Sequence, residues 1–151
     1  MTDLLISVCV PVYNGEKHLK ECLDSCISQT FTNYEIIICD DGSSDKGISI
    51  IESYVAKYKQ IKFVKNEKNL GLLGNWNKCV ELASGTWIKF LFQDDIMNSN
   101  CLEEFVKNTG AGVELIVCKR HFLLDDSATS DTKDYYQNRV RTLENTGHFT
   151  S

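Results

Sequence analysis

The length and composition of the chain indicate an ordinary folded domain. Its 151 residues suit one domain, because domains most often contain about 100–150 residues. A hydrophobic content of 42% and a charged content of 25% exclude general disorder. The net charge of −5 disfavours nucleic acid and anionic membranes as partners. No apolar run is long enough for a transmembrane helix, and Met1–Leu5 lack the basic residues of a signal peptide, so we expect a cytoplasmic protein.

The seven cysteines do not indicate a disulfide framework or a zinc site. Their number is odd, no Cys-x-x-Cys pair occurs, and no secretory signal precedes them. We expect them to behave as small buried hydrophobic residues in apolar strands and on apolar helix faces. The residues concerned are Cys9, Cys39 and Cys118 in strand-like runs, and Cys22, Cys26 and Cys79 on helices.

The first half of the chain alternates apolar runs with helical periodicity. Leu4–Val10 is a nearly continuous apolar run closed by Pro11, which predicts a strand buried on both faces. Apolar residues then recur at helical spacing over Glu16–Gln29. Glu35–Cys39 predicts a second buried strand. A second helix is expected over the apolar positions from Ile48 to Tyr58.

The same alternation continues beyond the second helix, for which Ser44 or Asp45 is the expected N-cap. Ile61–Val64 predicts a short third strand. The spacing of apolar residues over Leu72–Ala83 predicts a third helix, ended by Gly85 in the left-handed conformation.

A fourth strand and a shorter pair of elements complete the predicted pattern. Trp87–Phe92 is expected to form the strand, because it is apolar and bounded by turn residues. A short helix around Cys101–Lys107 and a last strand over Glu114–Cys118 follow.

The order of elements predicts an α/β fold with a mostly parallel sheet and helices on both faces. The commonest winding gives the strand order 3-2-1-4, with a cleft at the carboxyl ends of strands one and four. Polar motifs follow three strand ends: Pro11–Asn14, Asp40–Asp41 and Gln93–Asp95. We therefore expect all three motifs to meet at one edge of the sheet.

The expected edge is acidic and carries no known phosphate loop. Neither Gly-x-Gly-x-x-Gly nor Gly-Lys-Ser/Thr occurs. Carboxylates facing a bare diphosphate would repel it by roughly 4 kcal/mol per charge pair at about 4 Å and an effective dielectric of 20. Mg²⁺ is typically held by one or two carboxylates plus substrate phosphate oxygens, and Mn²⁺ prefers the same ligands. The charge pattern predicts a nucleoside diphosphate bridged to the protein by a divalent cation.

Each motif also has a simpler interpretation. Asp40–Ser44 is a good turn and helix cap, and Asp94–Asp95 could cap the next segment. Asn14–Gly15 is an ordinary turn signal. The expected meeting of all three at one edge favours the functional interpretation.

Four motifs together resemble a known family. They are Val10–Asn14, Cys39–Asp45, Asn69–Gly71 and Phe92–Asp95, and their order and spacing agree from Leu4 to His121. This combination is similar to glycosyltransferase family 2, whose GT-A fold is Rossmann-like. The resemblance implies that the chain contributes a nucleotide-sugar-binding core.

The resemblance also implies roles for particular residues. Asp41 would accept the N3–H of uracil, while the loop after the first strand would pack around the uridine. Asp95 would be the ligand of Mg²⁺ or Mn²⁺, with Asp94 beside the ribose or the metal. The complete set of expected nucleotide-binding residues is Pro11, Val12, Tyr13, Asn14, Asp41, Asn69, Gln93 and Asp94.

The chain departs from the family pattern in two places. Where many relatives carry Ala-Arg before the Asn of the third helix, this chain has Asn75–Trp76, so a cation that helps to hold the donor is missing. The family's catalytic base is an Asp or Glu well beyond the metal motif, in a region expected beyond Ser151. No catalytic residue is therefore assigned, and we expect this chain alone to be inactive.

The resemblance implies an organisation and a reaction. Residues 1–121 are expected to form the nucleotide-sugar-binding core, and 122–151 a polar tail or the start of a truncated acceptor-binding half. The expected reaction is inverting, metal-dependent transfer from an NDP-sugar, with UDP-sugar favoured, to a hydroxyl of a glycan or lipid-linked acceptor. Such enzymes serve cell-surface polysaccharide synthesis, and the full-length protein is expected at the inner face of the membrane.

Three alternatives remain open from the residues. A non-catalytic module that binds nucleoside diphosphate would have the same edge. A nucleotidyltransferase should carry a basic, Gly-rich loop after the first strand, which Pro11–Gly15 lacks. A phosphoacceptor signalling domain could use Lys119, but its acidic pair should follow the first strand, whereas Asp40–Asp41 follows the second.

Overall fold

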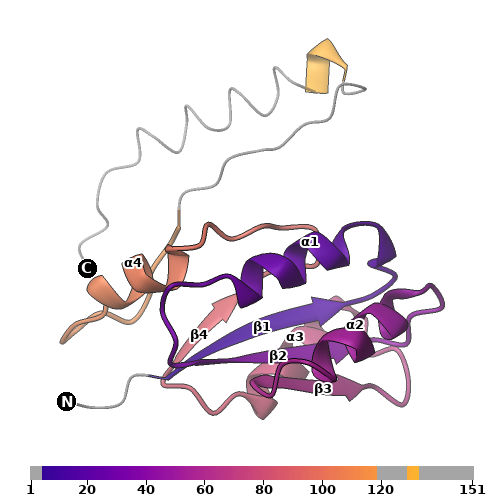
Figure 1. Ribbon diagram of the computed structural model, residues 1–151, viewed down its shortest axis with the longest axis horizontal. Coiled ribbons are helices and arrows are strands. Elements are labelled where there is room, and N and C mark those ends of the chain that lie inside the picture. Colours follow the sequence, from indigo (N-terminus) through magenta and orange to yellow (C-terminus); the bar gives the residue numbers. More distant parts are fainter. Residues whose placement is uncertain (1–4, 119–128, 133–151) are drawn as a thin grey trace. The chain divides into compact units, whose positions relative to one another are not determined.

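The computed structural model describes residues 5–118 and 129–132. The chain divides into two compact units, Met1–Gly112 and Val113–Ser151. The first unit contains a four-stranded parallel sheet with the order β3-β2-β1-β4 (Figure 1). The strands are β1 (Ile6–Val12), β2 (Tyr34–Asp40), β3 (Ile61–Lys65) and β4 (Trp87–Phe90). The predicted α/β class, parallel pairing and strand order are confirmed.

Four helices accompany the sheet in the same unit: α1 (Glu16–Ile27), α2 (Gly47–Val55), α3 (Gly71–Leu82) and α4 (Cys101–Lys107). Helix α3 packs against β1 and β2, where Cys9, Cys39 and Cys79 belong to one buried cluster. Helix α1 contacts α2, and Figure 1 shows this pair apart from α3. Every residue of β1 and β2 is buried, which explains why both strands read as continuous apolar runs.

Strand β1 continues through Pro11, past its predicted end. Pro11 still pairs with Cys39 of β2, but β1 pairs with β4 only from Ile6 to Cys9. The backbone of Cys9 faces β4, since its carbonyl accepts the Leu91 N–H at 2.9 Å. Pro11 faces the same way two residues later, where β4 has ended, so its missing N–H costs the sheet no hydrogen bond.

The turn between α3 and β4 corrects the prediction for Gly85. Gly85 does not have a positive φ, and α3 ends instead at Ala83 in an extended conformation. A Cβ atom at Gly85 would lie 2.6 Å from the Ser7 nitrogen and 2.7 Å from the Leu5 oxygen. Glycine is needed here because the turn approaches the β1 backbone closely, and not because it caps the helix.

The start of α2 also differs from the prediction. Lys46, and neither Ser44 nor Asp45, is its N-cap residue. The Asp45 carboxylate accepts the Glu16 N–H at 2.7 Å and the Gly47 N–H at 2.9 Å, so one side chain satisfies donors at the starts of α1 and α2. Glu16 in turn accepts the Lys46 N–H at 3.1 Å.

Two strand predictions towards the carboxyl-terminal end of the described chain are wrong. Strand β4 ends at Phe90 and not at Phe92, because the chain turns away after Leu91. Glu114–Cys118, in the second unit, is not a strand, since its apolar run has no pairing partner among the described residues. Cys118 is exposed there, contrary to prediction, whereas the five other predicted cysteines are buried. The predicted domain limit at residue 121 lies outside the described residues and stays a prediction.

The amino-terminal edge of the sheet carries a buried carboxylate, Glu35. Its Oε1 accepts the Ser7 Oγ–H at 2.7 Å and the Ser84 N–H at 2.6 Å, and its Oε2 pairs with Lys62 Nζ at 2.7 Å. Burial alone would raise the pKa of Glu35, but the Lys62 ammonium and the Ser7 and Ser84 donors lower it to about 2. Both carboxylate oxygens are therefore satisfied.

None of the helices among the described residues has the length and hydropathy needed to span a bilayer.

Candidate functional site

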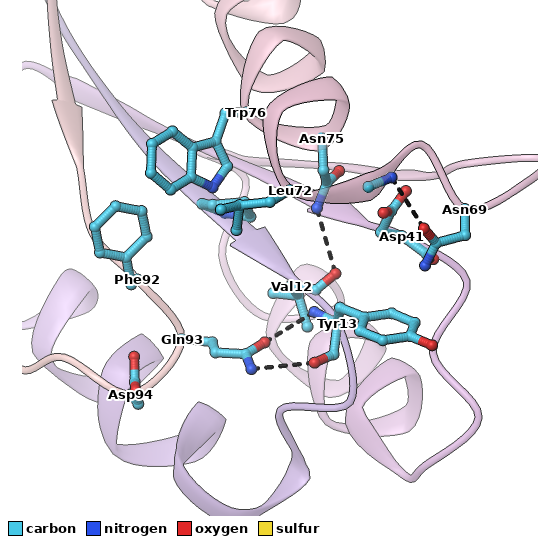
Figure 2. A pocket seen from close by; sticks show the side chains of 12 residues that line it. Val12, Tyr13, Asp41, Asn69, Leu72, Asn75, Trp76, Phe92, Gln93 and Asp94 are labelled. Carbon is cyan, nitrogen blue, oxygen red and sulfur yellow. Dashed lines mark hydrogen bonds between the residues drawn. The ribbon is translucent and has the colours of Figure 1, made fainter.

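A cavity of about 500 Å³ lies at the carboxyl edge of the sheet, within the first unit (Figure 2). Its walls come from the loop after β1, the end of β2, the start of α3 and the segment after β4. This volume falls in the range typical of small-molecule sites. The lining residues are Pro11, Val12, Tyr13, Asp41, Asn69, Gly71, Leu72, Asn75, Trp76, Phe92, Gln93 and Asp94.

Asp41 is the buried carboxylate in the cavity wall, with only 2% of its surface exposed. Its Oδ1 accepts hydrogen bonds from Asn66 Nδ2 at 2.9 Å and from the Leu70 N–H at 2.8 Å. No described residue donates a hydrogen bond to its Oδ2. The carboxylate is thus fixed through one oxygen, and the other is available to a donor on a ligand.

Two asparagines that the sequence analysis did not identify hold this arrangement. Asn66 Nδ2 also donates to Asn75 Oδ1 at 2.9 Å, and both side chains are buried. Asn75 Nδ2 donates to the carbonyls of Cys39 and Val12, so it fastens α3 to the ends of β2 and β1. One feature of the sequence could have indicated Asn75. It lies one helical turn before Cys79, and therefore on the face of α3 that packs on the sheet.

Asn69 lines the cavity but uses its amide within the protein. Its Nδ2 donates to the Asp41 carbonyl at 3.0 Å, and its Oδ1 accepts the Gly71 N–H at 2.9 Å. Gly71 has a φ of 73°, which favours glycine, and it begins α3. Asn69 therefore shapes the turn that delivers the Leu70 N–H to Asp41.

Asn14 does not line the cavity. It has a φ of 50°, and its Oδ1 accepts the Ser44 N–H at 2.9 Å while its own N–H donates to Ser43 Oγ at 2.9 Å. These contacts join the loops after β1 and β2. Its expected contact with a nucleotide stays a prediction, and its observed contacts are structural.

Gln93 and Tyr13 face each other across the cavity rim, as Figure 2 shows. The Tyr13 N–H donates to Gln93 Oε1 at 2.8 Å, and Gln93 Nε2 donates to the Tyr13 carbonyl at 3.1 Å. Tyr13 itself is 51% exposed. The side chain of Gln93 thus binds the backbone of the loop that carries Tyr13.

Only two of the four expected carboxylates line the cavity, Asp41 and Asp94. Asp40 is fully buried: its Oδ2 accepts the N–H groups of Gly42 at 3.1 Å and Ser43 at 3.0 Å, and its Oδ1 has no hydrogen-bond partner among the described residues. The Asp95 N–H donates to the Phe92 carbonyl in a turn that leaves Asp94, and not Asp95, among the lining residues.

No basic side chain is among the described residues that line the cavity, and no group of three potential metal ligands occurs among residues 5–118 and 129–132. A cation held by protein ligands alone is therefore not supported. A cation shared between one carboxylate and phosphate oxygens fits the donors present, because Mg²⁺ and Mn²⁺ bind in this way.

Aromatic side chains form the wall beside Asn75. The Trp76 ring lies 4.9 Å from that of Phe92 and 5.7 Å from that of Phe90, between ring centroids. Leu72, one turn earlier on α3, is 68% exposed at the cavity. Trp76 stands where many relatives carry an arginine, so packed aromatic rings take the place of that cation in the cavity wall.

The parallel sheet of order 3-2-1-4, with its cavity at the carboxyl edge, defines the class of nucleotide-binding α/β proteins. The comparisons with known proteins then identify the family. The model of the family "Glycosyl transferase family 2" matches residues 7–149. The chain belongs to glycosyl transferase family 2 and has the GT-A fold.

Several proteins that are named as glycosyltransferases or as glycan synthases are similar to this chain. A chondroitin synthase from Escherichia coli is 35% identical over 108 residues, which are 69% of this chain and 16% of that protein. TarS from S. aureus, solved with UDP-GlcNAc, is 33% identical with a TM-score of 0.65, over 69% of this chain and 30% of that one. A mannosyltransferase from Pyrobaculum calidifontis, solved with GDP-Man and Mn²⁺, is 21% identical with a TM-score of 0.63, over 68% of this chain and 31% of that one, and shows the fold alone.

The chain spans between 15% and 45% of the length of the curated relatives to which we compared it.

Proposed function

We propose that the cavity binds the nucleotide part of an NDP-sugar, and that the chain is the donor-binding part of a metal-dependent, inverting glycosyltransferase. The observation that carries the proposal is the hydrogen bonding of Asp41: Oδ1 accepts from two donors, and no described residue donates to Oδ2, while Asp41 lines the cavity. The similarity to TarS, solved with UDP-GlcNAc, supports UDP as the nucleotide.

The nucleoside end of the ligand is proposed to lie near Asp41 and Tyr13. Asp41 Oδ2 is suited to accept the N3–H of uracil, because a carboxylate only accepts hydrogen bonds. Tyr13 is half exposed in the cavity wall and offers a ring face to the base or ribose. The buried Asn66–Asn75 pair would keep the acceptor oxygen in place during binding.

The diphosphate end is proposed to lie near Asp94. Since no described lining residue is basic, a diphosphate there needs a divalent cation to offset the carboxylates. Bound Mg²⁺ or Mn²⁺ would neutralise the diphosphate and stabilise it as the leaving group. Asp94 is the better candidate ligand, because it lines the cavity and Asp95 does not. The assignment of the metal to Asp95 stays a prediction, and comparison of the variants Asp94→Asn and Asp95→Asn tests it.

The proposed reaction breaks the bond between the sugar and the diphosphate and forms a bond to an acceptor hydroxyl. No described residue is assigned as the base that removes the hydroxyl proton. The relationship to a chondroitin synthase supports a glycan acceptor and a role in polysaccharide synthesis. A lipid-linked acceptor at the inner face of the membrane is the second acceptor class that we propose.

Calorimetric titration with UDP, GDP and dTDP, each with and without Mn²⁺, tests the proposal. We expect UDP to bind most tightly and Mn²⁺ to strengthen its binding. Equal affinity for all three nucleotides would contradict the preference for UDP, and binding of none would contradict nucleotide binding. Sugar transfer by the longest natural chain separates an enzyme from a non-catalytic nucleotide-binding module.

A further inference from the structure

We infer that Gln93 is a positioning residue that acts through Tyr13 and links the nucleoside end of the cavity to the end that carries Asp94. This inference rests on the proposed function, because Tyr13 and Asp94 are taken to contact two ends of one ligand. The sequence predicted that Gln93 itself binds the nucleotide. Its observed contacts indicate a different role.

Both polar atoms of the Gln93 amide bind the backbone of one residue, Tyr13, in the neighbouring loop. Oε1 accepts the Tyr13 N–H at 2.8 Å, and Nε2 donates to the Tyr13 carbonyl at 3.1 Å (Figure 2). A paired donor and acceptor fix both the position and the orientation of the backbone, which a single hydrogen bond does not. The orientation of the Gln93 amide is thus set by the protein, although one N–H and one lone pair of the group remain unused by these two bonds.

The place of this contact follows from the sheet. The backbone of Cys9 faces β4 and accepts the Leu91 N–H, and the direction repeats every second residue along β1. Tyr13 therefore also faces the β4 side, but β4 has ended at Phe90. Gln93 comes from the segment after β4, and its side chain supplies the pairing that the strand no longer provides.

Gly15 makes room for the Gln93 side chain. A Cβ atom at Gly15 would lie 2.6 Å from Gln93 Oε1 and 2.8 Å from its Cδ. Gly15 has a φ of −98°, a conformation open to any residue, so its glycine is required by the contact and not by the backbone. A methyl group at this position would collide first with Gln93, because the three nearest heavy atoms all belong to that side chain.

The contact has a consequence for binding. Gln93 is adjacent to Asp94, so an interaction that fixes Asp94 also fixes the residue that holds Tyr13. The two ends of the ligand are then coupled: ordering at one end favours binding at the other, and the coupling is reciprocal. Tyr13 is expected to lose its defined position when Gln93 is removed, even though the Tyr13 side chain is intact.

The test uses three variants, Gln93→Ala, Gly15→Ala and the double variant, with Gly110→Ala as a matched control. A Cβ atom at Gly110 would meet nothing within 4 Å, and Gly110 is not among the glycines with positive φ. Two quantities are measured: hydrogen exchange of the Tyr13 amide without ligand, and the affinity for uridine without metal. Uridine has no phosphate, so a change in its affinity does not report on the metal.

We expect each single variant to speed exchange of the Tyr13 amide by about tenfold or more, and to weaken uridine binding by about threefold to thirtyfold, the range for one or two neutral hydrogen bonds. The double variant should be no worse than Gln93→Ala, because both changes remove the same contact. Gly110→Ala should change neither quantity, and all four proteins should unfold cooperatively.

Unchanged Tyr13 exchange in Gln93→Ala would overturn the inference, as would losses that add in the double variant. Faster exchange with unchanged uridine affinity would overturn the link to binding. If the unmodified chain binds neither uridine nor UDP with Mn²⁺, the proposed function fails. The exchange data would still decide whether Gln93 holds the Tyr13 backbone.

Discussion

The buried carboxylates at the two edges of the sheet differ in how completely they are hydrogen-bonded. At the amino edge, Glu35 of β2 uses both oxygens, with Ser7, Ser84 and Lys62 as donors. At the carboxyl edge, six residues further along the chain, Asp41 follows β2; two donors bind its Oδ1, and none of the described residues donates to its Oδ2. The difference lies in hydrogen bonding and not in burial, since Glu35 is 8% exposed and Asp41 2%.

This difference in hydrogen bonding distinguishes residues that stabilise the fold from residues that are suited to bind a ligand. A buried polar group with all its partners rigidifies the structure, whereas one with an unpartnered atom lowers stability until a donor arrives. The cavity described above lies at the carboxyl edge, and Asp41 is among its lining residues. Substitutions at the two edges should therefore change different measurements, stability at one and binding at the other.

The largest effect is expected for Glu35→Gln, which removes the charge that pairs with Lys62. The lowered pKa of Glu35, about 2, corresponds to about 3 kcal/mol of stability at neutral pH. The folded pKa lies below the ordinary value of 4.5, so this stability is complete above pH 4.5 and disappears as the pH falls toward 2. Urea denaturation at pH 7 and pH 3 should show a smaller difference between variant and parent at the lower pH. A difference independent of pH would contradict the charge-based account.

The next effect is expected for Asp41→Asn, in binding and not in stability. The amide oxygen can still accept from Asn66 and Leu70, while the NH₂ group faces the ligand where an acceptor is needed. A hydrogen bond to a charged group contributes about 1.5–3 kcal/mol, so UDP affinity should fall about tenfold to a hundredfold with or without Mn²⁺. Calorimetry measures the affinity, and thermal unfolding without ligand is the control. An unchanged affinity for UDP would show that the nucleobase does not bind at Asp41.

Asp94→Asn and Asp95→Asn form a matched pair for the metal. Even outer partners of a metal ligand change metal affinity about 10- to 100-fold, so loss of the ligand itself should remove most of the gain in UDP affinity that Mn²⁺ gives. We expect this loss in Asp94→Asn and not in Asp95→Asn, because only Asp94 lines the cavity. Binding of UDP without metal should be unchanged or slightly stronger in Asp94→Asn, since one repulsive charge is gone. The opposite ranking would restore Asp95 as the ligand.

The smallest effect is expected for Asp40→Asn. Asp40 is fully buried, its Oδ2 accepts two N–H groups and its Oδ1 has no hydrogen-bond partner in the described part of the chain. The amide oxygen can replace Oδ2, and the variant removes a carboxylate whose burial is only half compensated. We expect stability to change by less than about 1 kcal/mol, in contrast to Glu35→Gln. A loss of more than about 2 kcal/mol in urea denaturation would show that Oδ1 is satisfied after all.

Much of the fold was predictable from the sequence because its signals are local. The apolar runs predicted the strands, the commonest winding of alternating strands and helices predicted their order, and the motifs after the strands predicted the edge where polar residues meet. Features that depend on approach between distant segments were not predictable. Gly85 looks like a helix stop, yet it is needed because the turn meets β1 across 78 residues, as the bond from its N–H to Ser7 Oγ shows.

The candidate site was predictable in part for the same reason. Asp41, Tyr13 and Asp94 lie where the motifs placed them, at the cavity. Asn66 and Asn75 were missed because they are 9 residues apart and their partners in β1, in β2 and after β2 are 25 to 63 residues away, so no short motif contains them. The prediction of a strand over Glu114–Cys118 was wrong because a local apolar run does not by itself supply a neighbouring strand to pair with.

The shared carboxylate of Asp45 has a consequence for ligand binding. Because it accepts N–H groups at the starts of both α1 and α2, the loops that precede these helices cannot shift independently without breaking one of its bonds. Those loops carry Tyr13 and Asp41, which both line the cavity. A ligand that contacts both therefore meets a surface already assembled, and loses less conformational entropy in forming the complex than it would between two separately moving loops.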